Sequence, residues 1–378
     1  MTNRLEASES WDPAHDLPTL IRELSAIAAP TGHEQRMTAA VHAHLTGLGL
    51  RPRQDLLGQL SVSFGPEEAE RSVMVNAHVD ELGLIVRAID EDGWVLVHRL
   101  GGMPERVLPG SRLVVHTRGG DLPAVCGVKS HHLTSPEEKY VGKPATALYL
   151  DVGMEDRKAV EAAGLRIGDP ITYAPTWDTF SNGRFAGKSL DNRLGVAVLL
   201  GIVDRLRQEP PKARVHVAFS CQEEFNVRGT LALAARLQPD MAVTLDVTPA
   251  TDTPDLKGEG EVRLGDGPSL SRMSFHGRGT LGGLIPPPSL VDAVEQAAVR
   301  GGSELQYDAV IGVITDAAFL PMATAKGIAA VGLGIPCRYT HSPVETAQLS
   351  DVRETTTLLA ELLLHAHEID LLAGYSVV

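Results

Sequence analysis

The sequence predicts an α/β protein, a mixed β-sheet flanked by helices, with a small β module inserted into it. Residues 17–84 and 179–378 alternate helical and β-like segments, which is typical of a sheet covered by helices. Residues 85–178 instead carry short β-like runs between glycine, proline and polar turns. We therefore expect a discontinuous α/β domain, residues 1–84 and 179–378, around an inserted β domain, residues 85–178. The 378 residues, 43% of them hydrophobic, are enough for a large core.

The individual elements follow from hydrophobic spacing and from breaks at proline and glycine. Two helices are expected over residues 17–28 and 34–48, and two strands within residues 71–89 around a polar interruption. In the inserted module, strands are predicted within residues 93–100, 111–117, 123–130, 145–153 and 169–175, and one short helix within 154–164. Beyond it, helices 189–209, 223–238, 288–302 and 351–369 alternate with strands 212–220, 241–247 and 327–336.

Composition excludes several classes of partner. The formal net charge of −14 repels the phosphates of nucleic acids and of anionic membranes. The three cysteines, Cys126, Cys221 and Cys337, form no CxxC motif, which argues against a disulfide framework or a thiolate zinc site and favours a reducing cytosol. The N-terminus lacks the pattern of a signal peptide, and no apolar run approaches the roughly 18 residues of a membrane-spanning helix. We expect a cytoplasmic protein.

Two adjacent glutamates, Glu223 and Glu224, follow the apolar run "ARVHVAF", which predicts a buried strand. Repulsion and loss of hydration both oppose two like charges at the end of such a strand. Either a cation lies beside them or the pair is exposed to water. Neighbouring residues of an extended segment point in opposite directions, so the two carboxylates can have different roles.

Other side chains able to bind metal also follow apolar runs. They are His78 and Asp80 after "VMVNA", Asp191 before a predicted helix, Asp246 in "AVTLDV", and His341 after the last apolar strand. In an open α/β sheet, sites gather outside the carboxyl ends of the strands, so these segments could converge in one crevice. Individually, each residue has a simpler explanation, such as a helix N-cap for Asp191 or a turn for Asp246.

The complete set fits two divalent cations. Imidazole and carboxylate ligands together suit zinc, cobalt or manganese better than calcium or magnesium, which prefer oxygen ligands alone. The charges of Asp191, Glu224 and Asp246, with one bridging hydroxide, balance those of two such ions. In this hypothesis one glutamate binds metal and the other faces the water that the metals activate.

Five motifs in this order make the chain resemble the M42 family of metallo-aminopeptidases over almost its whole length, from about Leu17 to Leu371. The family includes tetrahedral and glutamyl aminopeptidases and relatives labelled cellulase M or FrvX. The motifs that carry the resemblance are "AHVDELGLIV", "GKSLDNRLG", "CQEEFNVRGT", "LDVTPATDTP" and "IPCRYTHSPVE".

The resemblance implies a role for each candidate residue. One metal would be bound by His78 and Asp246 and the other by Glu224 and His341, and Asp191 would bridge both through a segment with a cis peptide bond. Glu223 would be the general base. Asp80 would hydrogen-bond the far nitrogen of the histidine two residues before it and fix its tautomer. The inserted module would be a PDZ-like dimerisation domain, and dimers would assemble into a tetrahedral dodecamer.

The sequence departs from the family pattern at two places. Phe225 and Asn226 replace a Val-Gly pair, and Val313 and Ile314 stand where glycine is usual, while Asp316 is retained. Both changes are expected near the substrate pocket. They therefore affect which N-terminal side chain the protein would prefer more than they affect the reaction itself.

The hypothesis for function is a dinuclear metal-dependent aminopeptidase that hydrolyses N-terminal residues from peptides. A water between the metals would attack, and Glu223 would take its proton. Two alternatives stay open at this point. The same centre could act as an amidase or deacylase on a small substrate, or the protein could be an inactive scaffold that retains the fold.

Overall fold

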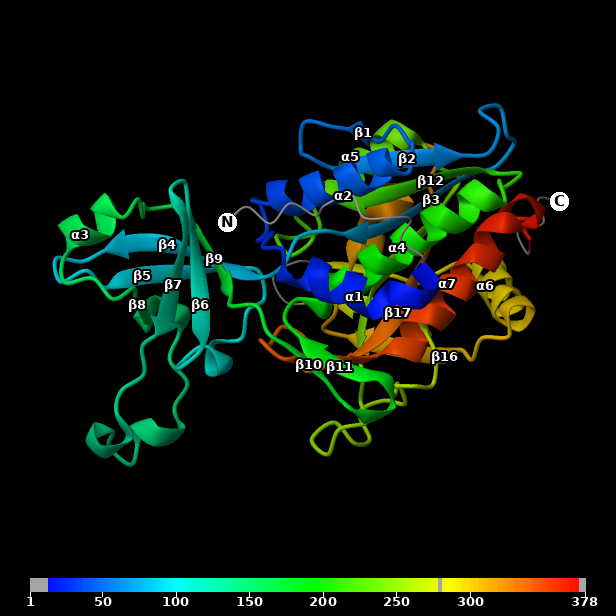
Figure 1. Cartoon of the computed structure of the whole chain (residues 1–378). Coiled ribbons are helices and arrows are strands. Elements are labelled where there is room, and N and C mark those ends of the chain that lie inside the picture. Colours follow the sequence, from blue (N-terminus) through cyan, green and yellow to red (C-terminus); the bar gives the residue numbers. More distant parts are fainter. Residues whose placement is uncertain (1–12, 278–280, 374–378) are drawn as a thin grey trace.

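The computed structural model describes residues 13–277 and 281–373. It consists of a large body of helices and strands with a smaller β-barrel beside it (Figure 1). The chain leaves the body after strand β3 (Ser72–His78) and returns at strand β10 (Trp177–Thr179). The expected fold class, a mixed sheet flanked by helices with an inserted small β-barrel, is therefore confirmed.

The body is built on a mixed sheet in which β12, β3, β13 and β17 are parallel. Beside β17, strand β14 (Ser269–His276) pairs with β15 (Gly282–Leu284) and β16 (Gln306–Ile311). The main path runs in the order β1 (Arg53–Gln54), β2 (Leu60–Phe64), β12 (Arg214–Ser220), β3 (Ser72–His78), β13 (Met241–Pro249), β17 (Ala329–Arg338), β18 (Glu345–Gln348), β11 (Arg184–Gly187) and β10 (Trp177–Thr179).

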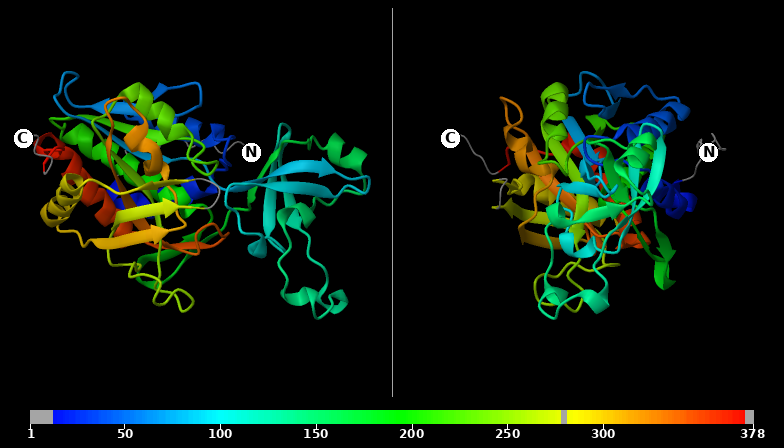
Figure 2. Two further views of the ribbon diagram at one scale, coloured as in Figure 1. Left: turned by 180° about the vertical axis from the view of Figure 1, so that it is seen from behind. Right: turned by 90° about the vertical axis from the view of Figure 1, so that its left-hand side faces the viewer.

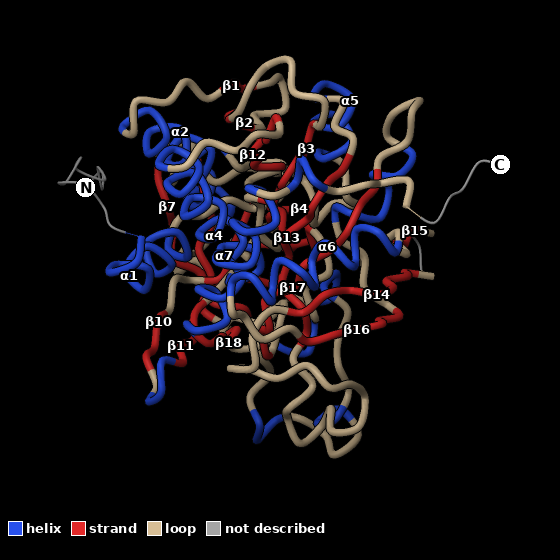
Figure 3. The backbone as a smooth tube through the Cα atoms, turned by 90° about the vertical axis from the view of Figure 1, so that its right-hand side faces the viewer, coloured by secondary structure: helices blue, strands red, loops and turns tan. Residues whose placement is uncertain are grey.

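Both faces of this sheet are covered, and alternate residues of a strand belong to different cores. On β3, Val73 and Val75 face the larger core, whereas Met74 faces a smaller core on the opposite side. Figure 3 shows α1 (Pro13–Ala26), α2 (Gln35–Gly47) and α4 (Leu190–Gln208) on one side of β3 and β12, and α5 (Gly229–Leu237) on the other. The helices of the larger core are α1 (Pro13–Ala26), α2 (Gln35–Gly47), α4 (Leu190–Gln208), α6 (Pro288–Gly301) and α7 (Leu349–Leu364); α5 (Gly229–Leu237) and the 3₁₀ helix η6 (Asp316–Met322) contribute to the smaller one.

The inserted segment forms a closed barrel with its own apolar core. A short helix, α3 (Arg157–Ala162), follows β8, and a long connection between β7 and β8 projects from the barrel (Figure 2). The barrel order is β4 (Gly83–Ile89), β5 (Val95–Leu100), β8 (Tyr149–Asp151), β7 (Gly120–Cys126), β6 (Arg112–Thr117) and β9 (Pro170–Tyr173).

The sequence-based prediction of one helix start was wrong. Residues 223–238 were expected to be helical throughout, but α5 begins only at Gly229. Before it, Gln222, Asn226 and Val227 all have positive φ angles, between 54° and 67°, which no helix accommodates. The chain instead makes a compact turn just after β12, and this turn carries the adjacent glutamates.

A buried ion network links the end of β3 to the segment before Asp191. Glu81 accepts hydrogen bonds from Lys188 Nζ (2.5 Å) and from the amide of Ala29 (2.8 Å), and Arg193 lies 3.5 Å from the same carboxylate. All three charged side chains are almost completely buried. Removing one member of such a network would leave an uncompensated buried charge and would be strongly destabilising.

No helix within residues 13–277 and 281–373 combines the length and apolar character needed to cross a membrane.

Candidate metal centre

The carboxyl ends of the parallel strands bring the candidate residues to one edge of the sheet. His78 is the last residue of β3 and lies in register with Ser220 at the end of β12. Asp246 lies near the end of β13, in register with Gly334 of β17, and His341 follows β17. Segments far apart in the sequence therefore meet where an open α/β sheet forms its binding sites.

Two groups of potential metal ligands share one residue. Ligand atoms of His78, Asp191 and Asp246 lie within 4.8 Å of one another, and so do those of Asp191, Glu224 and His341. Asp191 reaches both histidines, with Oδ1 3.2 Å from His78 Nε2 and Oδ2 3.4 Å from His341 Nε2. We call the first group cluster one and the second cluster two. The two oxygens of Asp191 are thus directed at different clusters.

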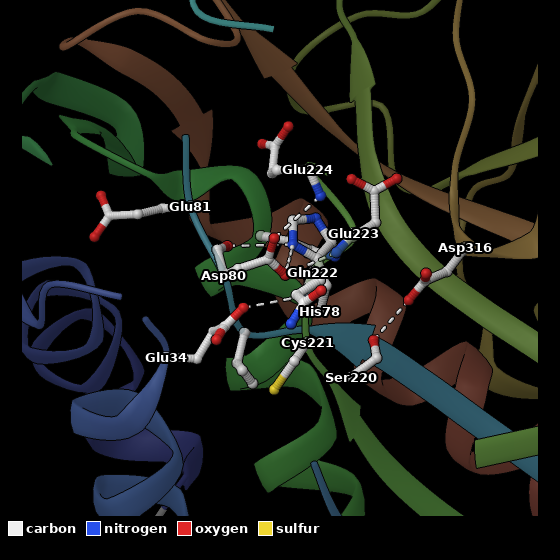
Figure 4. Close-up of polar contacts among 12 residues, drawn as sticks. Glu34, His78, Asp80, Glu81, Ser220, Cys221, Gln222, Glu223, Glu224 and Asp316 are labelled. Carbon is white, nitrogen blue, oxygen red and sulfur yellow. Dashed lines mark hydrogen bonds and ion pairs between the residues drawn. The ribbon is translucent and has the colours of Figure 1, made fainter. Parts of the chain in front are cut away.

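The environment of Asp80 differs in detail from the expectation. His78 Nδ1 lies 3.2 Å from the main-chain oxygen of Asp80 and 3.5 Å from its carboxylate Oδ1, so the carbonyl is the closer partner. The carboxylate also accepts the backbone N–H groups of Glu223 and Glu224, both at 3.0 Å. Asp80 therefore connects the histidine of cluster one to the paired glutamates (Figure 4).

The surroundings of the glutamate pair fit a bound cation. Burial raises the pKa of Glu223 well above its ordinary value, and burial together with the charge of Asp191 raises the pKa of Glu224 to about 8. Burial and Asp191 likewise raise the pKa of Asp246 to about 6. Glu224 Oε1 is buried without a hydrogen-bond partner among the described residues. An orphaned carboxylate oxygen beside other acids and imidazoles fits divalent metal ions, which would satisfy it and reverse these shifts.

Glu345 holds both segments that flank cluster two, although it contributes no ligand atom to either cluster. Its carboxylate accepts the amide N–H of Asp191 at 3.0 Å and that of His341 at 2.6 Å. Next to Asp191, the peptide bond to Asn192 is cis, as the resemblance implied, and Asn192 Nδ2 donates to the carbonyl of Leu245 at 2.8 Å. Glu345 ends one of the five motifs, but the sequence alone gave no sign of this role.

A second set of polar side chains lies behind the glutamates. Asp316 Oδ2 accepts hydrogen bonds from Ser220 Oγ (2.6 Å) and Asn76 Nδ2 (3.1 Å), and all three residues are buried. Asn76 Oδ1 in turn accepts from the hydroxyl of Thr244. This network joins β3, β12 and β13 to η6 directly beneath the clusters.

A cleft of about 500 Å³ opens onto both clusters. The four departures from the family pattern, Phe225, Asn226, Val313 and Ile314, all line it. The lining also includes Arg99 from β5 of the barrel, whose Nη1 lies 3.2 Å from Glu105 Oε1. Sequence reasoning missed Arg99, because nothing in a barrel strand signals that it borders a site in another part of the chain.

Comparison with known proteins agrees with this geometry. The M42 glutamyl aminopeptidase family matches residues 58–358. The chain is 33% identical over 335 residues to the SgcX protein of Escherichia coli strain K12, covering 88% of this chain and 90% of that protein.

Two solved structures share the fold over most of the chain. One is the TET aminopeptidase from the marine sediment archaeon Thaumarchaeota archaeon SCGC AB-539-E09, with a TM-score of 0.87 and 27% identity, covering 97% of this chain and all of that one. The other is the TET1 peptidase of Pyrococcus horikoshii, described as assembling into a tetrahedron or a large octahedral shell, with a TM-score of 0.80, 27% identity and coverage of 92% and 99%. The chain therefore belongs to the M42 family of metal-dependent aminopeptidases and is a hydrolase of the exopeptidase type.

Proposed function

We propose that the protein is a dinuclear metal-dependent aminopeptidase that removes N-terminal residues from peptides. His78 and Asp246 would hold one ion, Glu224 and His341 the other, and Asp191 both. The observation that carries this proposal is the sharing of Asp191 between two groups of ligand atoms, each within 4.8 Å. The donor set of imidazoles and carboxylates suits zinc or cobalt, and also manganese.

When bound, such ions act as Lewis acids toward a peptide carbonyl and lower the pKa of a coordinated water. Glu223 is the residue proposed to move protons. It is buried and lines the cleft next to the ligand Glu224, but it belongs to neither cluster. It would accept the proton of the attacking water and then donate it to the departing amine.

The turn that follows β12 gives the base a defined position. Asp80 accepts the backbone N–H groups of both glutamates, so a rotation of this turn would break two charge-assisted hydrogen bonds. A base must lie within hydrogen-bond reach of the proton it removes, and this anchoring supports that requirement.

The rival activity, deacylation of a small amide, is separated from aminopeptidase activity by the substrate's amine. We expect cleavage of aminoacyl-p-nitroanilides and no cleavage of the same compounds carrying an N-acetyl group, because an exopeptidase of this type requires a free α-amine. Initial rates on matched pairs test this directly. Equal or faster cleavage of the acetylated members would favour the deacylase and contradict the proposal.

We also propose that residues 85–178 act as a dimerisation domain and that dimers build a larger homo-oligomer, supported by the tetrahedral assembly of the Pyrococcus horikoshii relative. The projecting connection of the barrel exposes Leu133, Tyr140 and Val141, which is consistent with burial against another copy. A cytoplasmic location is proposed because Cys126, Cys221 and Cys337 are all free and buried.

A further inference from the structure

The barrel touches the ligands of cluster two through two consecutive glycines. Gly101 and Gly102 directly follow β5, and both line the cleft. The carbonyl oxygen of Gly102 lies 3.2 Å from His341 Nδ1. A carbonyl can only accept a hydrogen bond, so this contact favours the tautomer with the proton on Nδ1, in which Nε2, the nitrogen that faces Asp191, would have its lone pair available for a metal.

The glycines fit so closely that a Cβ atom on either would force its neighbours to shift. A Cβ atom on Gly102 would lie 3.1 Å from both Cε1 and Nδ1 of the His341 ring. A Cβ on Gly101 would lie 3.1 Å from the carbonyl oxygen of Glu224, 3.3 Å from its Cβ and 2.5 Å from Leu82 Cδ2. The turn therefore packs against the two residues that distinguish cluster two from cluster one.

Cluster one is supported differently. His78 ends β3 and is oriented by the main chain of Asp80, while Asp246 lies within β13 and accepts the N–H of Val247. These contacts all come from the body of the protein. A disturbance of the barrel turn is thus expected to reach one metal site and to spare the other.

We propose that the Gly101–Gly102 turn is a positioning element of the second metal site and sets that site's affinity for its ion. The inserted domain would then complete the metal centre in addition to any role in assembly. This inference rests on the proposed dinuclear centre. The turn orients His341 through its carbonyl oxygen and limits the space open to Glu224, but it provides no ligand.

The barrel offers a matched control for a substitution at Gly101. Gly101 and Gly110 have nearly equal φ angles, 81° and 84°, so alanine is strained to a similar degree at both. A Cβ on Gly110, however, meets nothing within 4 Å. Any difference between Gly101→Ala and Gly110→Ala therefore reports the contacts of the new Cβ with Leu82 and Glu224 and not the backbone strain. Gly142 is the corresponding control for Gly102, because its φ is ordinary and its surroundings are open.

The experiment measures metal content in the full-length variants. Each protein is stripped with a chelator, dialysed against a series of buffered free zinc concentrations and analysed for zinc per chain. We expect two binding steps in the wild type, Gly110→Ala and Gly142→Ala. In Gly101→Ala and Gly102→Ala, the first step should be unchanged and the second weakened by about 10-fold or more, as for other residues that orient metal ligands.

Cobalt in place of zinc gives a second readout, because the visible spectrum of the second ion should change in Gly102→Ala. Loss of both steps together would indicate general damage to the fold and would overturn the inference. So would two unchanged steps in Gly101→Ala and Gly102→Ala. A wild-type chain that binds fewer than two ions would overturn the proposed dinuclear centre together with this inference. Failure of the dinuclear centre is thus seen in the wild type, whereas failure of the inference alone is seen only in the variants.

Discussion

Glu223→Gln is expected to lower kcat by about 10²–10⁴-fold, the usual contribution of a general acid–base group. The glutamine is almost isosteric, so the turn held by Asp80 should keep its shape, but the amide cannot accept a proton. Because Glu223 belongs to neither cluster, the content of both metals should equal that of the wild type. Initial rates and elemental analysis of the same samples measure both quantities.

A suitable control for this variant is Glu259→Gln, since Glu259 is exposed and is not among the residues that line the cleft. It should retain wild-type kcat. A fully metal-loaded Glu223→Gln enzyme with undiminished kcat would remove Glu223 from the reaction and leave the proton transfer to another group.

Asp191→Ala is expected to abolish activity and to release both metals. The side chain approaches His78 through one oxygen and His341 through the other, so its removal takes a ligand from each cluster. Asp246→Ala provides the matched comparison, because Asp246 belongs to cluster one alone and its loss should weaken only one ion. Zinc per chain after dialysis at fixed free zinc distinguishes the two variants.

Folding of both variants can be followed by thermal melting of the metal-free proteins. Asp191 and Asp246 belong to neither apolar core of the body, so their truncation should not unfold the stripped protein. Two tightly bound ions in a folded Asp191→Ala protein would show that Asp191 does not bridge.

Much of the fold could be predicted because hydrophobic periodicity reports burial directly. Apolar, β-branched runs predicted the strands that end at His78 and Ser220. Helical spacing of apolar residues predicted the long helix α4. Strand β16 was not predicted, since its residues alternate between half-buried and exposed at the margin of the sheet. Such a strand buries too little to leave a pattern in the sequence.

The candidate site could be predicted as a list of residues but not as an arrangement. The strand ends made it reasonable that His78, Asp246 and His341 converge, because parallel strands share one edge. The contacts that position the candidate ligands come from residues that no sequence motif singles out. Glu345 acts through backbone amides, and the barrel turn at Gly102 approaches the site from a separately folded segment.

The late start of helix α5, at Gly229, also results from contacts that the sequence does not reveal. The sequence from Glu223 onward has helical spacing, yet Asp80 takes the N–H groups of the glutamates and the positive φ of Asn226 turns the chain away. The tertiary contacts of this turn therefore override its local helical propensity.

This centre is expected to hydrolyse peptides only with metal bound, and one measurement tests that expectation most directly. The protein is stripped of metal, and its initial rate on a panel of aminoacyl-p-nitroanilides is measured before and after refilling with zinc, cobalt or manganese. We predict negligible rates in the stripped protein and restored cleavage of some members on refilling, with the pattern giving both the preferred ion and the preferred N-terminal side chain. Full activity of the stripped protein, or no activity on any member with two ions bound per chain, would contradict the account.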